Sequence, residues 1–244
     1  FGLWFTVDGG RKWIQLNGGL PTTTVKDIAI QERENDLAIA SFGRGFYILD
    51  DYSPLRSVDA QALESPAILF PTDKAWLHMQ TSRIGDREKA SLGETYYTAA
   101  NPPYGAVLTW YLREGWKSKK ELRQEAETKK IEAKQAIDYP SLDALRAETQ
   151  QEKAQLLFTI ADSAGTVVRR LESKPSKGIH RIAWDLRYPA ANPAVKGSGD
   201  RPAYLPPPQG PLVPPGTYSV RVELVADGAV EQLAPPQSFE VEVL

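Results

Sequence analysis

Few side chains in this chain have types and spacing that could do chemistry. Asp50 and Asp51 are adjacent at the end of a strand-like run, and two neighbouring carboxylates can share a hard cation such as Ca²⁺. No D-x-D-x-D loop accompanies them. We therefore interpret the pair as caps of the turn into Tyr52, Ser53 and Pro54, because a short carboxylate readily accepts nearby backbone N–H groups.

The histidines do not suggest a catalytic or metal site. His78 and His180 are the only two, and they lie far apart in the sequence, in different predicted domains, which disfavours zinc. A Ser-His-Asp triad would need one of them as its base, yet the chain has no G-x-S-x-G nucleophile motif. We expect His180 to be an ordinary strand residue, and we predict no cofactor and no metal.

Composition narrows the function classes further. The 244 residues are 41% hydrophobic and 25% charged, a balance typical of one large or two small globular domains. A net charge of −2 argues against nucleic-acid binding, which requires a basic face. Without cysteines the chain has neither disulfides nor thiolate metal sites. No apolar run approaches the roughly 18 residues needed to span a bilayer, so no transmembrane segment is predicted.

The elements that must position any site begin with the stretch Thr6 to Trp13, which has the form S/T-x-D-x-G-x-x-W between two apolar runs. In a hairpin corner of this kind the Asp8 carboxylate accepts backbone N–H groups of the turn, and Gly10 takes a positive φ. Trp13 is expected to fold its indole over the corner. Strands are predicted next at Val25–Ile30, Asp36–Phe42 and Phe46–Leu49, then at Pro54–Arg56 and Ser65–Pro71.

These motifs, in this order, resemble the last blade of bacterial neuraminidase-repeat (Asp-box) β-propellers of the sortilin-like kind, which are often labelled glycosyl hydrolases. The resemblance implies that residues 1–80 are the end of such a propeller, with its last blade and closing strand, and that the chain is a fragment. Its N-terminal blades, supplied by polypeptide before Phe1, would be the first partner. It also implies an extracytoplasmic location: periplasmic, secreted or cell-surface.

In that family the Asp box marks the blade periphery, so Thr6, Asp8, Gly10 and Trp13 are expected to be structural. Arg44, between two glycines at a strand end, is the one arginine placed where a propeller pocket could use it for a ligand. The alternative that we favour is an ion pair of Arg44 with a neighbouring carboxylate of the Asp50-Asp51 pair.

The second half of the chain predicts another β domain. Residues 81–103 are expected to be a linker, and residues 104–244 a β-sandwich with alternating strands. Charged residues at helical spacing predict a solvated helical hairpin inserted at about 117–154. A Pro-rich loop follows at 189–215. The elements around Trp184 resemble the immunoglobulin- or fibronectin-like domain that ends these propeller proteins, related to that of flagellar hook-capping proteins, with Trp184 as the core tryptophan.

The expected class is therefore all-β, and the expected function is a non-catalytic binding or scaffolding module that engages protein or glycan partners. The first alternative is a sialidase-like glycoside hydrolase. Its arginine cluster, tyrosine nucleophile and acids would have to come from blades outside this chain, since these residues cannot supply the set. The second alternative is an accessory subunit of a surface or membrane-associated complex.

Overall fold

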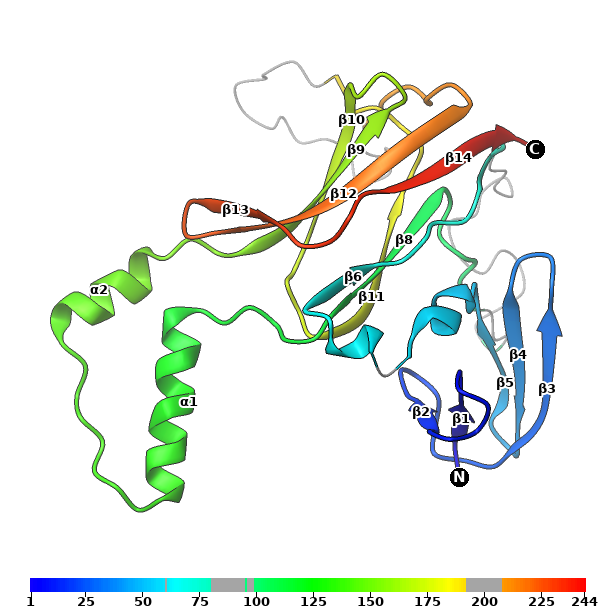
Figure 1. Cartoon of the computed structure of the whole chain (residues 1–244). Helices are drawn as coiled ribbons and strands as arrows, with labels where there is room; N and C mark the ends of the chain where they lie inside the picture. Colours follow the sequence, from blue (N-terminus) through cyan, green and yellow to red (C-terminus); the bar gives the residue numbers. More distant parts are fainter. Residues whose placement is uncertain (60, 80–94, 96–98, 192–207) are drawn as a thin grey trace. The chain divides into compact units, whose positions relative to one another are not determined.

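The computed structural model describes residues 1–59, 61–79, 95, 99–191 and 208–244 (Figure 1). The protein is mostly β, with 40% strand and 15% helix, and it contains several antiparallel sheets, one of them a curled half-barrel, and two helices. The described residues form two units, the first comprising residues 1–65 with 99–102 and the second comprising the rest.

Unit 1 contains a hairpin and a three-stranded meander. Strands β1 (Leu3–Phe5) and β2 (Ile14–Leu16) pair antiparallel around the Asp-box corner, with Leu3 opposite Leu16. Strands β3 (Val25–Gln31), β4 (Asp36–Ser41) and β5 (Gly45–Leu49) follow one another in an antiparallel sheet. The three strands predicted here from their apolar and β-branched residues are confirmed.

The strand expected at Pro54–Arg56 is wrong. The segment is the 3₁₀ helix η1 (Ser53–Ser57), and a second short 3₁₀ helix, η2 (Ala62–Glu64), follows it. Pro54 lies in the first turn of η1, where its fixed φ suits a helix and its missing N–H is not needed. The carboxylate of Asp51 accepts the backbone N–H of Ser53 at 3.0 Å, so the capping role predicted for this residue is confirmed.

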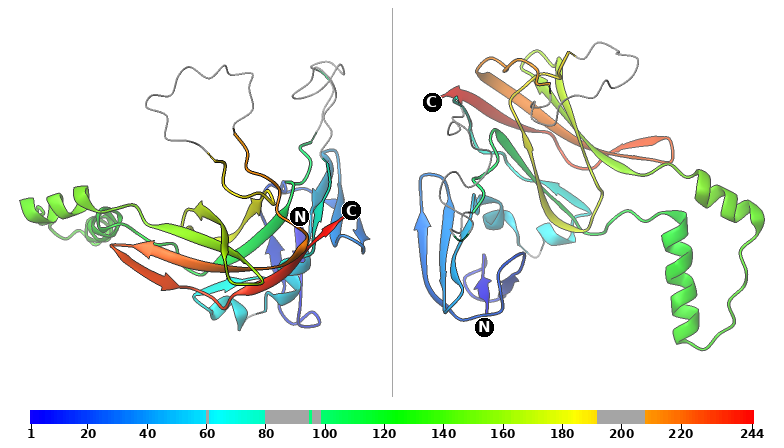
Figure 2. Two further views of the ribbon diagram at one scale, coloured as in Figure 1. Left: turned by 90° about the horizontal axis from the view of Figure 1, so that it is seen from above. Right: turned by 180° about the vertical axis from the view of Figure 1, so that it is seen from behind.

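Unit 2 contains two sheets (Figure 2). The larger has the order β10-β9-β12-β14-β7, with β13 also paired to β12, and the smaller has the order β11-β8-β6. The strands of the larger sheet are β7 (Ala75–Leu77), β9 (Gln155–Asp162), β10 (Val167–Ser173), β12 (Gly216–Ala226), β13 (Ala229–Gln232) and β14 (Gln237–Val243). Those of the smaller sheet are β6 (Ala67–Leu69), β8 (Ala106–Leu112) and β11 (Gly178–Trp184).

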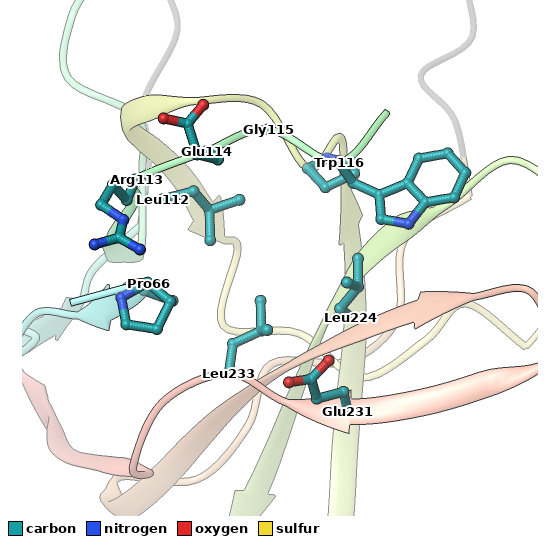
Figure 3. A pocket seen from close by; sticks show the side chains of 11 residues that line it. Pro66, Leu112, Arg113, Glu114, Gly115, Trp116, Leu224, Glu231 and Leu233 are labelled. Atoms are coloured by element: carbon teal, nitrogen blue, oxygen red, sulfur yellow. The ribbon is translucent and has the colours of Figure 1, made fainter. Parts of the chain in front are cut away.

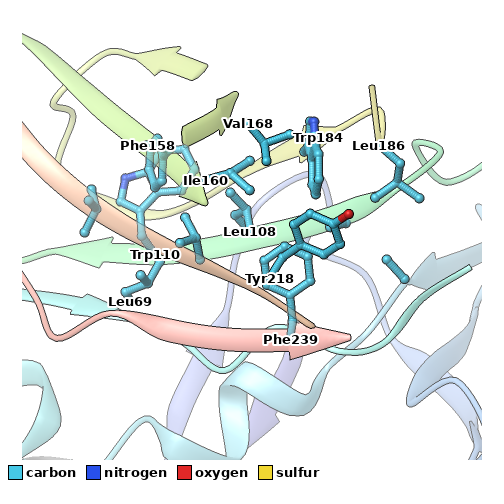
Figure 4. Packing of buried hydrophobic residues seen from close by; sticks show 14 of the residues in the cluster. Leu69, Leu108, Trp110, Phe158, Ile160, Val168, Trp184, Leu186, Tyr218 and Phe239 are labelled. Carbon is cyan, nitrogen blue, oxygen red and sulfur yellow. The ribbon is translucent and has the colours of Figure 1, made fainter. Parts of the chain in front are cut away.

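Side chains from both sheets of unit 2 share one hydrophobic core (Figure 4). Trp184 is completely buried there, which confirms its prediction as the core tryptophan, and its ring lies 5.3 Å from that of Tyr218. Trp110 packs on Phe158 with 4.7 Å between ring centroids. The Trp184 indole N–H donates to the carbonyl of Arg187 at 3.0 Å, so this polar atom is paired inside the core.

Two strands that the sequence analysis groups with the first domain pair with strands of unit 2. β6 is antiparallel to β8, and β7 is parallel to β14. The division between the units accordingly falls between Ser65 and Pro66 and not near residue 80, where the sequence predicts it. Most of the expected linker 81–103 and the middle of the Pro-rich loop 189–215 lie outside the described residues.

Two helices lie between β8 and β9, within the predicted insertion at 117–154. They are α1 (Lys119–Glu132), which begins with a capping box formed by Ser118 and Glu121, and α2 (Leu142–Gln150), capped by Ser141. Neither helix has a buried residue, as expected for a solvated insertion. In the part of the chain that the structure describes, no helix has the length and apolar character that crossing a bilayer requires.

Candidate functional site

The Asp-box corner between β1 and β2 is held by hydrogen bonds of its own side chains. The Asp8 carboxylate accepts the backbone N–H groups of Arg11 and Lys12 at 2.9 and 3.0 Å. Thr6 donates its hydroxyl proton to Asp8 at 2.7 Å and accepts the N–H of Gly10 at 3.0 Å. The positive φ of Gly10, +93°, lets the chain turn so that these N–H groups converge.

These donors also set the charge state of the corner. The N–H of Lys12, followed by the Thr6 hydroxyl, lowers the pKa of Asp8 below its ordinary value, so the carboxylate is ionised at neutral pH. One oxygen, Oδ1, accepts all three of these hydrogen bonds, so the carboxylate serves the turn. Trp13 is 57% exposed. The corner is thus a structural element of unit 1.

Arg44 lies in the turn between β4 and β5, flanked by Gly43 and Gly45 with φ of +70° and +80°. Asp50 and Asp51 follow the other end of β5. A strand rises about 3.3 Å per residue, so the backbones of Arg44 and Asp50 are about 20 Å apart. An ion pair with either residue is therefore ruled out, and that favoured interpretation of Arg44 is wrong. Among the described residues none pairs with the Arg44 guanidinium, which is exposed.

The sheet β3-β4-β5 carries apolar side chains on both faces, although one of the two faces also carries Asp27, Gln31 and Asp36. The register places Ile28 opposite Ile39 and Ile39 opposite Tyr47, so these three side chains share one face. The other face carries the small or large apolar residues Ala29, Ala38, Ala40, Phe46 and Ile48. Strands that are buried on both faces have near-continuous runs of apolar residues in their sequence. Here, however, the large side chains of the edge strands are exposed, namely Ile28 at 45%, Ile30 at 56%, Phe46 at 81% and Ile48 at 59%.

His180 is a strand residue, as the sequence predicts. His180 lies on β11, where its ring is 5.7 Å from that of Trp110 and its Nε2 is 3.0 Å from the carbonyl oxygen of Lys177. His78 packs edge-on against Tyr104 at 5.0 Å. Within the described ranges no group of three or more His, Asp or Glu side chains could hold a metal ion.

A pocket of about 270 Å³ opens at one end of the unit 2 core (Figure 3). Its apolar wall includes Leu112, Leu224 and Leu233, and Trp116 lies beside them. Charged groups stand around it, namely Arg113, Glu114 and Glu231. The sequence does not predict this pocket, because its walls come from five separate segments of the chain. Nothing in the sequence marks Glu231 as a pocket residue, since it lies in the short, exposed strand β13 beside Gln232.

No family model, curated protein or solved structure matches the chain.

Proposed function

We propose that unit 1 is the end of an Asp-box β-propeller and that the protein is a non-catalytic binding or scaffolding module outside the cytoplasm. The observation that carries the proposal is the β3-β4-β5 sheet, which exposes large apolar side chains on each face, such as Ile30 on one and Phe46 on the other. A sheet of this kind requires a covering layer on each side. A blade between two neighbouring blades receives both layers.

The hairpin of β1 and β2 supports the same interpretation. The Asp box lies between two paired strands, as it does between the third and fourth strands of a propeller blade in the family that the sequence resembles. The next three strands would then begin the following blade. For unit 2, two sheets around the buried Trp184 support an immunoglobulin-like β-sandwich. The extracytoplasmic location rests on the family resemblance alone.

The blade proposal is tested by hydrogen exchange on the protein purified from its native source, together with whatever polypeptide accompanies this chain. We expect backbone amides of β3 and β5 to be protected there and to exchange much faster in the isolated 244-residue chain. Amides of β9 and β12 in unit 2 serve as the internal control and should exchange alike in both samples. Equal exchange of β3 and β5 in the two samples would refute the blade assignment.

The rival function, a sialidase-like glycoside hydrolase, draws on one observation, the exposed and unpaired Arg44 in its glycine-flanked turn. Fluorogenic glycosides, sialosides included, should not be turned over by the native-source protein if it is a binding module. Turnover that falls in an Arg44→Ala variant, and not in a matched Arg33→Ala variant, would establish the hydrolase instead. Stable co-purification with membrane or surface proteins would place the chain in a larger complex.

A further inference from the structure

Glu231, an exposed residue of β13, places a carboxylate at the unit 2 pocket. Glu231 of β13 is directly opposite Leu224 of β12, so the two side chains point to the same face of the sheet. That face is the one from which Leu224 and Leu233 line the pocket. Figure 3 shows Glu231, Leu224 and Trp116 along one side of the pocket, with Arg113 and Pro66 on the other.

The other charges around the pocket are compensated within the protein. Glu114 accepts a hydrogen bond from the Lys177 ammonium at 3.0 Å, and this contact is the main cause of its lowered pKa. Arg113 is also engaged in an interaction of its own. The carboxylate of Glu231, by contrast, makes no hydrogen bond or ion pair with any described residue. The pocket therefore presents one uncompensated negative charge beside an apolar wall.

We propose that this pocket binds a lysine side chain of a partner protein. The aliphatic stem would lie on Leu112, Leu224 and Leu233, and the ammonium would reach Glu231 beside the indole of Trp116. An anionic group would be repelled by Glu231, and a purely apolar side chain would cover that carboxylate without pairing it, which costs free energy. The volume of about 270 Å³ is small for an organic ligand and suits a single side chain.

A guanidinium could also pair with this carboxylate through two parallel hydrogen bonds, so arginine is the competing occupant. The small volume of about 270 Å³ favours the compact ammonium of lysine over the wider planar guanidinium. The inference concerns unit 2 only. It goes beyond the proposed function and does not depend on the blade assignment of unit 1.

The test is a titration of the ¹⁵N-labelled chain followed by NMR. The ligands are N-acetyl-lysine-N-methylamide, the norleucine analogue of the same length without the charge, and the arginine analogue. We expect saturable shifts of the Trp116 indole N–H and the Leu224 amide, with lysine bound about fivefold more tightly than norleucine. Added salt should weaken lysine binding and leave norleucine unaffected.

Two variants assign the effect to Glu231. Glu231→Gln should remove the preference for lysine over norleucine, whereas Glu172→Gln, an exposed strand position away from the pocket, should keep it. Equal binding of lysine and norleucine would show an apolar pocket only, and tighter binding of arginine would identify a different partner chemistry. Either result, or the absence of saturable shifts at Trp116 and Leu224, overturns the proposal.

Discussion

Gly105 should be among the least replaceable residues of unit 2. It precedes β8 with a φ of +107°, and a Cβ atom built on it would lie only 1.9 Å from the carbonyl oxygen of Trp184. Real Cβ atoms essentially never approach other atoms closer than 3.0 Å. An alanine here would therefore push the start of β8 away from the end of β11, where Ala106 pairs with Trp184.

The cost of Gly105→Ala has two parts. The left-handed backbone costs a residue with a Cβ about 1–2 kcal/mol. Separating the strands also loses about one or two backbone hydrogen bonds, at about 1 kcal/mol each, and loosens the packing of Trp184. We expect a total loss of about 3–5 kcal/mol in the free energy of unfolding of unit 2.

Gly165 provides the matched control. It has a φ of +80° in the turn between β9 and β10, and nothing lies within 4 Å of a Cβ built on it. Gly165→Ala should therefore lose only the backbone part, about 1–2 kcal/mol. Native-state hydrogen exchange at the Phe158 and Val220 amides measures both variants in the same unit. Equal losses in the two variants would refute the steric argument for Gly105.

Three further outcomes are expected. Because the folded-state pKa of Asp8 is lowered, its turn hydrogen bonds stabilise the Asp-box corner above the ordinary aspartate pKa of 3.8 and are lost as pH falls through the lower folded value. An NMR titration of the Lys12 amide should show a midpoint below 3.8, and Asp8→Asn should abolish it. Arg123 donates to Glu148 at 2.6 and 3.0 Å and to Glu127 at 2.8 Å. Arg123→Gln should therefore speed amide exchange in α2 and leave amide exchange in β9 unchanged. Lys129→Gln, at a residue without such a bridge among the described residues, is the control. Phe158→Ala removes a fully buried ring and should cost about 3–5 kcal/mol by urea unfolding, whereas Val230→Ala on the exposed β13 should stay within about 0.5 kcal/mol.

Local features of this chain were predictable where a few neighbouring residues decide them. The turn hydrogen bonds of Asp8, the cap at Ser141 and the strands β3 to β5 all follow from residue types within one short window. The burial of Trp184 was expected from the resemblance of its surrounding elements to a β-sandwich.

Features that depend on distant partners were not predictable. The three-residue strands β6 and β7 are apolar, but nothing within them tells which sheet they join, and they pair with β8 and β14. Residue propensity does not distinguish a strand from a 3₁₀ turn that begins at a proline. The pattern Pro54–Arg56 therefore predicts a strand where the structure has η1. The pocket beside Glu231 depends on the register of β12 and β13 and on loops from elsewhere, which the sequence does not reveal.

The parallel pairing of β14 with β7 has a consequence for synthesis on the ribosome. β7 is made early, yet the strand beside it is the last of the unit, so Val241 must emerge before Ala75 acquires its neighbour. Until then β7 and β12 each have an edge with unpaired backbone N–H and C=O groups, which can pair with other nascent chains. A product truncated before residue 237 would keep those edges open, and cells would tend to degrade or aggregate it.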